Sequence, residues 1–423
     1  MTVSRSPAWR AFRRFLEAAG PGFVKFGQAL SVRPDLLPAG LIRELERLQD
    51  RAPPVPFREI ARTVEGELGA PALRLFRGIE PVPVASASVA QVHRAVLPGG
   101  TAVAVKVLRP GVERAMARNL ALLGGCFRAL CALPPLRGRV DGPALWTEVC
   151  GAIQAELDLR GEAEAAGTMA RNFRGFPGVR IPRVFWSHTS RRVLTMEFVE
   201  GRKISDPLVR GRPEYRELAE RGARAFFKQV LDDGLFHADL HPANLLITPR
   251  QEIAYVDFGI RGRLSREERE AVLGALAGLM ARDVTLAVRH LERLGVVVPE
   301  GRREAFAREV AGVMDRVLRP RLADVPAAAV GTGILRAARR HGVRFPHRHA
   351  VLVKALLTIE GTARLLHPEF SFERAVRRYL LDRAAQKATL GSLAEALWRG
   401  AALLGLAALT AAGGGSAGPA EGG

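Results

Sequence analysis

Cysteine, lysine and long apolar runs are all scarce in this chain. Its 423 residues include three cysteines, Cys126, Cys131 and Cys150, which are too few for a disulfide framework and lack zinc-ligand spacing. We therefore expect buried thiols in a reducing compartment. No uncharged apolar stretch reaches the ~18 residues of a membrane-spanning helix. Because no apolar run near the N-terminus precedes a small-residue cleavage site, a secretory signal is not expected.

The basic charge is carried almost wholly by arginine. Lys and Arg number 63 against 43 Asp and Glu, which gives a formal net charge of +20. The lysines are Lys25, Lys106, Lys203, Lys228, Lys354 and Lys387. A positive field favours nucleotides, nucleic acid or anionic lipid without choosing among them, and an arginine-rich genome composition explains the excess equally well. No recognised nucleic-acid-binding motif occurs, so we expect no nucleic-acid partner.

Length and patterning predict an α+β molecule of several units. The content of 48% hydrophobic and 25% charged residues excludes global disorder. We expect a helical extension over 1–55, a strand-bearing lobe with a helical insertion over 56–200, and a mostly helical lobe over 201–387. Residues 388–423 predict an apolar helix and a disordered, low-complexity tail. Two lobes of different composition predict a cleft between them.

The expected elements follow hydrophobic periodicity and the Gly and Pro breakers. Helices are expected over 9–19, 23–33, 41–49 and 57–69, between 112 and 172, and as three or four further segments up to about 387. Strands are expected over 82–96 and 101–108 as an antiparallel hairpin, over 179–181 and 192–198, and in a short hairpin within 244–260.

The segment Phe236–Asn244 (FHADLHPAN) carries the strongest chemical signal. Asp239 and Asn244 lie five residues apart, and Asp257 begins a DFG sequence directly after the expected strand IAYV. Phosphoryl transfer needs a carboxylate at the proton of the attacking group, and an amide oxygen with a second carboxylate to hold Mg²⁺. The spacing matches the kinase pattern H-R-D-x-x-x-x-N followed by D-F-G. A capped turn with an incidental DFG is the alternative.

A lysine and a phosphate-facing loop are expected upstream. Lys106 ends the strand-like sequence VAVK, where a kinase fold places the lysine that contacts the α- and β-phosphates; the alternative is a snorkelling strand-end lysine. Alanine replaces all three glycines of the usual G-x-G-x-x-G loop, which predicts a stiffer loop and altered nucleotide binding. The loop residues expected to bind the nucleotide are Ala85, Ser86, Ala87, Ser88, Val89 and Ala90. Glu197 and Val199, beside the Glu200-Gly201 link, are further cofactor-binding candidates.

An acidic helix is expected to orient Lys106. The candidates are Glu156, Asp158, Glu162 and Glu164. Asp158 and Glu162 are four residues apart and share a helix face. A solvated acidic face is the alternative, and the spacing does not decide which carboxylate pairs with Lys106.

Together these motifs resemble the UbiB-type (AarF/ADCK) atypical protein-kinase-like family, which is associated with ubiquinone biosynthesis. Lys25–Gln28 (KFGQ) matches the family's KxGQ segment, and Ala85–Ser88 (ASAS) matches its alanine-rich loop. Glu156–Asp158 (ELD) matches its ExD motif, His237–Asn244 its catalytic loop, and Asp257–Gly259 its metal motif. The resemblance covers residues from about 9 to 380, and Ala243 departs from it where glycine is common.

The resemblance implies a two-lobed protein-kinase-like fold that uses ATP and Mg²⁺. Lys106 would bind the ATP phosphates and pair with an acidic residue, for which Glu162 is favoured. Asp239 would be the acidic residue of the catalytic loop, and Asn244 and Asp257 would hold Mg²⁺.

The KxGQ segment is implied to be regulatory. Lys25 and Gln28 would belong to an extension that folds over the active site, with Lys25 near Glu156 and Asp158. This extension would block a protein substrate, and it favours ATP hydrolysis or a quinone precursor or other lipid-like substrate.

Membrane contact has two possible sources. Gly400–Ala412 is uncharged but shorter than the ~20 residues of a span; with 388–399 it is long enough, so spanning, interfacial and buried helices remain alternatives. Arginines beside Trp9, Phe12 and Phe15 could contact anionic lipid, or this helix could pack on the kinase body. We expect a cytoplasmic protein at the inner membrane face, peripheral or anchored by its C-terminus.

Two other functions fit parts of the pattern. A phosphotransferase of the aminoglycoside or choline kinase type shares the H-x-D…N logic but not the KFGQ segment or the alanine-rich loop. A non-catalytic scaffold that binds lipid and switches with nucleotide would not need Lys106, Asp239, Asn244 and Asp257 together. The sequence does not indicate the phosphoacceptor or the oligomeric state.

Overall fold

The computed structural model describes residues 7–31, 37–48, 52–132, 142–281, 283–317 and 327–385. The chain divides into two compact units, Met1–Phe372 and Glu373–Gly423. The described part of the second unit, 373–385, is helical. The apolar segment expected over 388–412 and the tail lie outside the described residues. Among the helices that can be described, none is both long and apolar enough to cross a membrane.

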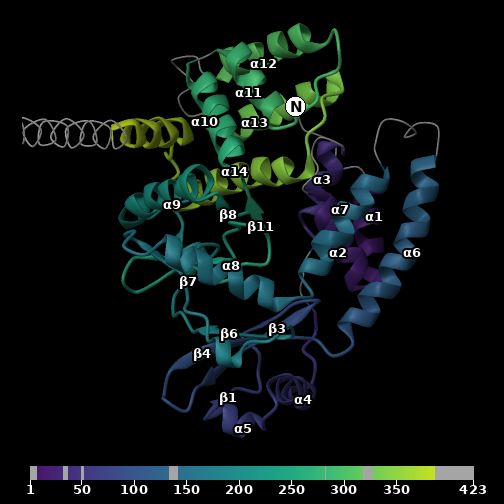
Figure 1. Ribbon diagram of the computed structural model, residues 1–423, viewed down its shortest axis with the longest axis vertical. Coiled ribbons are helices and arrows are strands. Elements are labelled where there is room, and N and C mark those ends of the chain that lie inside the picture. The colour runs from purple at the N-terminus through teal and green to yellow at the C-terminus, as the bar shows by residue number, and fades with distance from the viewer. Residues whose placement is uncertain are drawn as a thin grey trace, which may run out of the picture. The chain divides into compact units, whose positions relative to one another are not determined.

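The extension is a group of short helices packed on the helical insertion. α1 (Pro7–Ala19), α2 (Pro21–Ser31) and α3 (Ala39–Leu45) contact one another, and α2 packs against α6 (Val112–Ala132) and α7 (Gly142–Ala155), as Figure 1 shows. Helix α2 begins at Pro21, two residues earlier than expected, because proline suits the first turn of a helix. Gly27 is required where it stands, since a Cβ there would lie 2.4 Å from Leu48.

An antiparallel sheet forms the first lobe. Its order is β1 (Gly78–Ile79), β3 (Ala90–Val96), β4 (Ala102–Leu108) and β6 (Val193–Glu197), and β2 (Ala85–Ser86) also pairs with β3. The hairpin of β3 and β4 confirms the prediction. The single strand expected from residue 82 is wrong, because the chain turns at Ala87, whose N–H donates to the carbonyl of Ala90.

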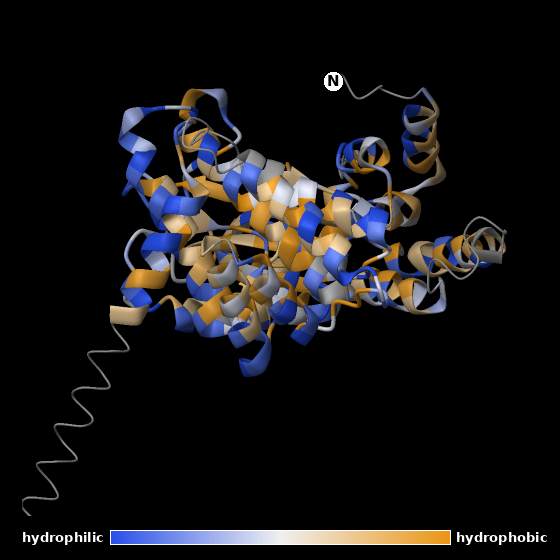
Figure 2. Ribbon diagram, turned by 90° about the horizontal axis from the view of Figure 1, so that it is seen from above, coloured by the Kyte–Doolittle hydropathy of each residue, from blue (hydrophilic) through white to orange (hydrophobic). Residues whose placement is uncertain are grey.

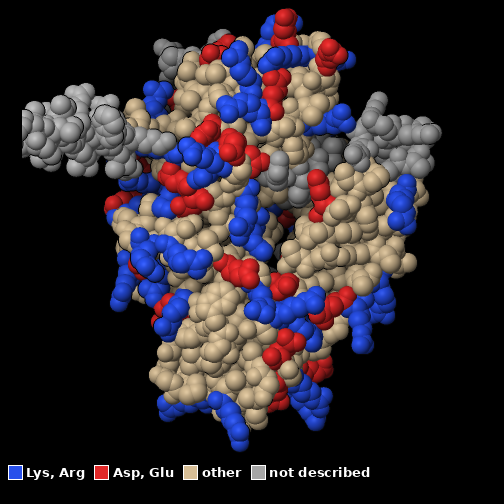
Figure 3. Space-filling model, viewed as in Figure 1, with Lys and Arg blue, Asp and Glu red and all other residues tan. Residues whose placement is uncertain are grey.

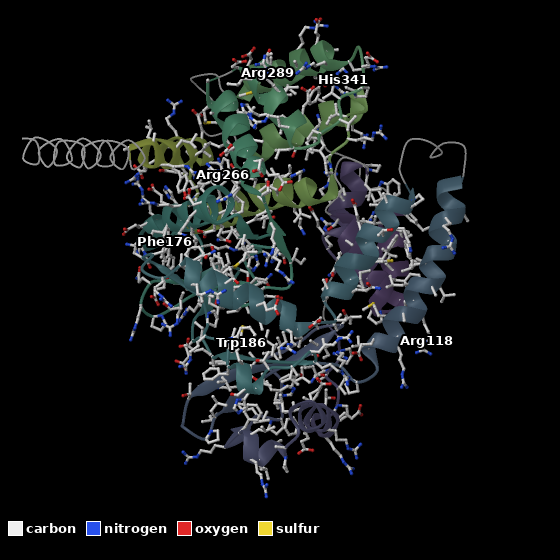
Figure 4. All side chains as sticks on the ribbon, in the orientation of Figure 1. Arg118, Phe176, Trp186, Arg266, Arg289 and His341 are labelled. Carbon is white, nitrogen blue, oxygen red and sulfur yellow. The ribbon has the colours of Figure 1, made fainter. Side chains whose placement is uncertain are left out.

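The sheet buries a valine-rich face. Val103, Val105 and Val107 point alternately into one core, where they meet Ile60 and Val64 of α4 (Phe57–Leu68). The short helix α5 (Ala72–Leu75) follows α4, and α8 (Leu159–Asn172) packs against β6. Trp186, in the 3-10 turn Trp186–His188 and labelled in Figure 4, lies against Gly167 of α8, where a Cβ would approach its ring to 3.3 Å. Helix α8 is thereby held against the lobe.

The second lobe carries two small sheets beneath its helices. One has the order β5 (Val179–Arg180), β10 (Ile253–Tyr255), β9 (Leu245–Ile247) and β7 (Arg202–Lys203). The hairpin of β9 and β10 confirms the prediction. The other pairs β8 (Leu235–His237) with β11 (Arg261–Arg263), which the sequence did not predict, because three-residue strands show too little alternation.

The helices of the second lobe enclose a separate apolar core. They are α9 (Arg216–Lys228) with the π-turn Gln229–Asp233, α10 (Arg266–Met280), α11 (Val284–Arg293), α12 (Arg303–Val317), α13 (Ala327–His341) and α14 (His347–Leu366). Phe306, Met314 and Val343 are buried in the core of α11–α13, and Figure 2 shows the apolar stretches of these helices alternating with polar ones. The expected three or four helices after residue 260 are therefore too few, since five are described before the helix at 373–385.

The cysteines are only partly as expected. Cys126 is exposed on α6 and Cys150 is half-buried on α7, so the prediction of buried thiols is wrong for Cys126. Helices α6 and α7 pack on α2 with one face only. Cys126 lies on the outer face of α6 and is therefore exposed to solvent, although cysteine is usually buried. The side chain of Cys131 lies outside the described part.

Candidate active site

A half-buried lysine joins the two lobes at the centre of the site. The Nζ of Lys106, from β4, donates to Oε1 and Oε2 of Glu162 in α8, each at 2.8 Å, and lies 3.4 Å from Oδ1 of Asp257. Glu162 also accepts from the backbone N–H of Phe258 at 3.3 Å. The structure thus brings Lys106 together with Glu162 rather than with Glu156, the choice that sequence spacing left open.

Burial and opposite charge compete within this cluster. Burial raises the pKa of Glu162 to about 7, against the pull of Lys106. Burial disfavours the charged form of Lys106, but Asp257 and Glu162 outweigh it, and the pKa of the ammonium is raised. Burial alone would raise the pKa of Asp257, but the Lys106 charge and the Gly259 N–H hold it below its usual range. Asp257 is therefore an ionised carboxylate beside a permanent ammonium.

The catalytic loop presents Asp239 and Asn244 as a bonded pair. The Nδ2 of Asn244 donates to Oδ2 of Asp239 at 2.9 Å and to its backbone carbonyl at 3.2 Å. The other carboxylate oxygen, Oδ1, lies 3.8 Å from Nζ of Lys354, on α14. Lys354 was not among the residues predicted from sequence. Lysine is rare beside the 57 arginines of this chain, and this rarity is the signal that could have indicated it.

His237 connects the two loops that carry the acidic groups. Its Nδ1 accepts from the Asp239 N–H at 3.1 Å, so the ring proton is on Nε2, which donates to the Asp257 carbonyl. Burial lowers the pKa of His237, which keeps the ring neutral. Gln229, in the π-turn after α9, accepts from the His237 N–H at 2.8 Å and donates to the Tyr255 hydroxyl at 3.2 Å. This buried network fixes both loops, and sequence reasoning missed Gln229.

The donor set fits a magnesium ion. Because Nδ2 of Asn244 donates to Asp239, the amide oxygen is directed elsewhere, and Asp257 supplies an ionised carboxylate; both are the hard oxygen donors that Mg²⁺ takes. Within the described ranges, no group of three His, Cys, Asp or Glu side chains could hold a metal by itself. A metal here would therefore have few ligands from the protein, and phosphate oxygens and water would complete its coordination shell, as they do for Mg²⁺ in nucleotide sites.

The alanine-rich loop is fixed by an arginine. Arg109, just after β4, donates from Nε to the Ala87 carbonyl at 2.6 Å and from a terminal nitrogen to Ser86 Oγ at 2.8 Å and to the Pro53 carbonyl at 2.7 Å. The Arg109 N–H donates to the Val89 carbonyl at 2.9 Å. Ala85 and Ala90 lie in the β-ladder, opposite Val92 and Leu108, and Ser88 is half-buried at the turn. The loop is held at several points by Arg109, and the stiffness expected from its alanines stays a prediction.

Glu197 and Val199 lie at the end of β6. The carboxylate of Glu197 accepts from Arg180 at 2.5 Å, and its N–H donates to the Arg183 carbonyl. Its side chain is thus engaged with β5 and is not directed at Lys106. Val199 follows β6 and is half-buried.

An ion pair links the KxGQ segment to Glu156 of the ExD motif. Lys25, on α2, is buried and its Nζ lies 2.5 Å from Oε2 of Glu156. Asp158 instead caps α8, where its Oδ1 accepts from the Arg160 N–H at 3.0 Å. Gln28 donates to the Leu48 carbonyl at 3.3 Å, a bond within the extension.

A cavity separates the extension from the alanine-rich loop. Its volume is about 770 Å³, and it is lined from the extension by Arg13, Glu17 and Val24 among others, and from the first lobe by Ser88 and Arg109. Figure 3 shows a hollow between the α2 and α7 group and the rest of the first unit, with basic side chains on the side opposite that group. The extension therefore borders the alanine-rich loop across this cavity.

The β4 lysine, its α8 glutamate, the Asp239–Asn244 loop and the DFG aspartate define a protein-kinase-like molecule. Residues 47–291 match the ABC1 atypical kinase-like domain, and 310–371 match the UbiB helical domain. The chain belongs to the UbiB family of ABC1 atypical kinase-like proteins, and both the family and the fold expected from its motifs are confirmed.

Relatives match most of the chain. A probable protein kinase UbiB of Marinobacter nauticus is 36% identical over 88% of this chain and 69% of its own length. An uncharacterised protein of Synechocystis is 35% identical over 89% of this chain and 65% of its own length. The chloroplastic Arabidopsis thaliana protein Activity of BC1 complex kinase 7 is 34% identical over 86% and 53%, respectively. The chain thus spans between about half and about two thirds of these relatives.

A solved structure shares the fold. The complex of Rv3197 with erythromycin from Mycobacterium tuberculosis superposes with a TM-score of 0.58 at 24% identity. The match covers 85% of this chain and 92% of the other.

Proposed function

We propose that this protein binds ATP with Mg²⁺ and transfers the γ-phosphoryl group to water or to a small or lipid-like acceptor. The observation that supports the proposal best is the cluster of Lys106, Glu162 and Asp257, contributed by three segments far apart in the sequence. Glu162 is buried behind Lys106, whereas the Asp257 side chain is 45% exposed, so one carboxylate holds the lysine and the other can be reached by a ligand.

Each group has a role in this reaction. Lys106 would bind the α- and β-phosphates, while Glu162 holds it in place. Asn244 and Asp257 would hold Mg²⁺, which when bound neutralises charge on the phosphate oxygens. The attacking oxygen forms a bond to the γ-phosphorus, the bond from that phosphorus to the bridging oxygen breaks, and ADP leaves. The proton of the attacking hydroxyl or water passes to the carboxylate of Asp239. Asn244 donates a hydrogen bond to this carboxylate and so keeps it beside the proposed Mg²⁺ ligands.

Mg²⁺-dependent ATP turnover by the full chain tests the proposal, with two isosteric variants. Asp257→Asn should lose Mg²⁺-dependent nucleotide binding because it removes a charged ligand. Asp239→Asn should keep nucleotide binding and lose ~10²–10⁴-fold in turnover, the usual contribution of a proton-transfer group. Unchanged nucleotide binding in Asp257→Asn, or unchanged turnover in Asp239→Asn, refutes the role concerned.

The same assays separate the other functions. Saturable phosphate transfer to a soluble alcohol would identify a small-molecule phosphotransferase. If Asp239→Asn still supported quinone synthesis in cells while it bound nucleotide, a nucleotide-switched scaffold would be the better description. We propose a role in isoprenoid-quinone or lipid metabolism, supported by membership of the UbiB family. Stimulation of turnover by quinone-precursor-like phenols would support this role.

A peripheral contact with the cytoplasmic face of the inner membrane accompanies this proposal. Helix α1 exposes Phe15, 57% accessible, beside the exposed Arg10 and Arg14, and the chain carries a net charge of +20. An aromatic side chain among arginines suits an anionic lipid surface. Phe15→Ser should weaken co-sedimentation with anionic vesicles, whereas Leu73→Ser on α5, which is 86% exposed and distant in sequence, should not. Equal binding of both variants would contradict the assignment.

A further inference from the structure

Helix α14 contacts the catalytic loop through a polar face. Lys354, Thr358 and Thr362 recur every four residues and so lie on the same side of the helix. Thr362 Oγ1 donates to the Leu240 carbonyl at 2.9 Å, and this bond is buried. Lys354 lies two turns away, 3.8 Å from the carboxylate of Asp239. Two successive loop residues are therefore held by one helix.

This helix does not belong to the kinase-like domain. It lies within the region 310–371 that matches the UbiB helical domain, beyond residue 291 where the kinase-like match ends. It packs against α9, which leads into the π-turn beneath the catalytic loop. The family's helical domain thus contributes a charged group to the site of the kinase-like domain.

The two oxygens of Asp239 have partners from two directions. Oδ2 accepts from Nδ2 of Asn244, within the loop, and Oδ1 faces the ammonium of Lys354, from α14. The hydrogen bond from Asn244 fixes one oxygen, and the charge of Lys354, 3.8 Å from the other, favours the orientation of the carboxylate in which Oδ1 faces the ammonium. Precise placement of a reacting group matters, because a displacement of about 1 Å can cost ~10²-fold in rate.

The choice of lysine is itself informative. Among the lysines in the described ranges, Lys25, Lys106, Lys228 and Lys354 each face a carboxylate, whereas Lys203 is exposed on β7. Arginine is the usual cation of this chain, so the few lysines that face a carboxylate are distinguished by their residue type. Lys354 also lies close enough to the extension to act on Glu46. Burial raises the pKa of the Glu46 carboxyl, and the charge of Lys354 lowers it.

We propose that Lys354 is a positioning residue for phosphoryl transfer, which orients the Asp239 carboxylate from the helical domain. The proposal rests on the proposed function, since Asp239 is the proton acceptor there. It implies that the helical domain takes part in the chemistry and does more than stabilise the kinase-like domain.

The test uses the full chain and four variants. Lys354→Met removes the charge and keeps the length, Lys354→Arg keeps the charge, and Lys203→Met is the matched control at an exposed lysine. Thr362→Val removes the neighbouring hydrogen bond and leaves the charge. We expect Lys354→Met to lower kcat for Mg²⁺-ATP by roughly 10–100-fold, with the KM for ATP within about threefold of that of the unmodified chain. Lys354→Arg should restore most of the loss, and Lys203→Met should have no effect.

Other results would overturn the proposal. A kcat for Lys354→Met equal to that of the unmodified chain would do so while leaving the proposed function intact. Equal losses in Lys354→Met and Lys354→Arg would show that charge is not what acts. A kcat in Thr362→Val as low as that in Lys354→Met would show that anchoring of the loop by α14, not the charge, matters.

Hydrogen exchange keeps the proposal testable if the unmodified chain turns over no ATP. In that case the proposed function fails, and the orientation of the loop is measured directly. Peptides that contain 237–244 should exchange faster in Lys354→Met than in the unmodified chain or in Lys203→Met, because the loop has lost one of its two anchors on α14. If the chain lacks turnover and exchange is the same in all three proteins, the positioning role is refuted as well.

Discussion

Lys106 occupies a position in this arginine-rich chain that arginine would not fit. The Nζ of Lys106 lies within 3.4 Å of three carboxylate oxygens that belong to Glu162 and Asp257. An ammonium can face several oxygens from one point, whereas a planar guanidinium needs a flat, forked partner. The residue type is therefore set by the geometry of the cluster.

Lys106→Arg tests this directly. The larger guanidinium should displace Asp257 or Glu162, although the charge is kept. We expect nucleotide affinity to fall by at least about tenfold, since each ~1.4 kcal/mol of lost interaction is a factor of ten. Titration with a fluorescent ATP analogue and Mg²⁺ measures it, with Lys203→Arg as the matched control. Equal affinities in both variants would show that only charge is needed at position 106.

Ala87 is the residue at which loop stiffness can be tested. Its N–H and carbonyl are both bonded, to Ala90 and Arg109, although its side chain is a single methyl. Ala87→Gly should change nucleotide affinity or selectivity by loosening the turn, and should cost roughly 0.5–1 kcal/mol of stability. Ala95→Gly, within β3 and with its methyl group in the core on the other face of the sheet, should cost a similar amount without affecting the nucleotide. If binding of ATP and GTP is identical in the two variants, the alanines do not act through stiffness.

At the scale of secondary-structure elements, periodic segments were predictable and short ones were not. Helix α1 and strand β4 have clear periods of 3.6 and 2 and were predicted to within two residues, whereas the strand that includes β3 was expected to begin at residue 82 and begins at Ala90. The pair of β8 and β11 and the π-turn Gln229–Asp233 are too short to show a period, and both are formed by tertiary contacts. The break in the strand at Ala87 depends on Arg109, which a local pattern does not reveal.

The first-lobe sheet contains a pH-sensitive residue away from the catalytic loop. His93, on β3, is 1% exposed; Nδ1 pairs with the Glu80 carbonyl at 2.8 Å and Nε2 with the Gln91 side chain at 3.2 Å. Burial lowers the pKa of His93 below its usual 6.5. The unfolded chain therefore takes up a proton more readily than the folded one, and stability contributed above pH 6.5 is lost as the pH falls.

The expected result is a thermal midpoint that falls between pH 7.5 and pH 5.5, two values chosen on either side of ~6.5. His93→Asn should reduce the size of this fall, because the amide can still donate to Glu80 but does not titrate. His367→Asn, in the second lobe, is the control. A pH dependence in His93→Asn as steep as in the unmodified chain would exclude His93 as its cause.

At the scale of the whole molecule, the site is assembled from contacts that no local pattern contains. Lys106 and Asp257 are 151 residues apart, and Lys106 and Glu162 are 56 apart. The motifs predicted which residues take part, because their types and spacings match phosphoryl-transfer chemistry. They did not show which acidic residue of the helical segment faces Lys106, since that depends on how α8 packs on β6. They also could not place Lys354, which reaches the site only through the fold.

The attachment of the extension also depends on a contact between distant parts of the chain. Lys25 on α2 is buried against Glu156, whose side chain is 24% exposed. Lys25→Met removes this pair and takes one cation away from the surroundings of the Glu156 carboxylate. The cost should be roughly 1–3 kcal/mol, less than the 3–5 kcal/mol of a fully buried pair because Glu156 is partly solvated. The lost free energy is the part that stabilises α2 against α7, so helices α1–α3 should detach from the rest of the chain more often.

Limited proteolysis with trypsin measures that opening, because α1–α3 contain arginines such as Arg13, Arg14 and Arg43. Cleavage within α1–α3 should be faster in Lys25→Met by several-fold or more, since ~1.4 kcal/mol corresponds to a tenfold change in the open population. Lys228→Met breaks a pair with Asp233 of similar length, 2.6 Å, within the second lobe and is the matched control. If both variants lose the extension at the same rate, the effect is a general loss of stability. Selective cleavage in Lys25→Met would show that the Lys25–Glu156 pair, together with the packing of α2 on α6 and α7, keeps the extension in place.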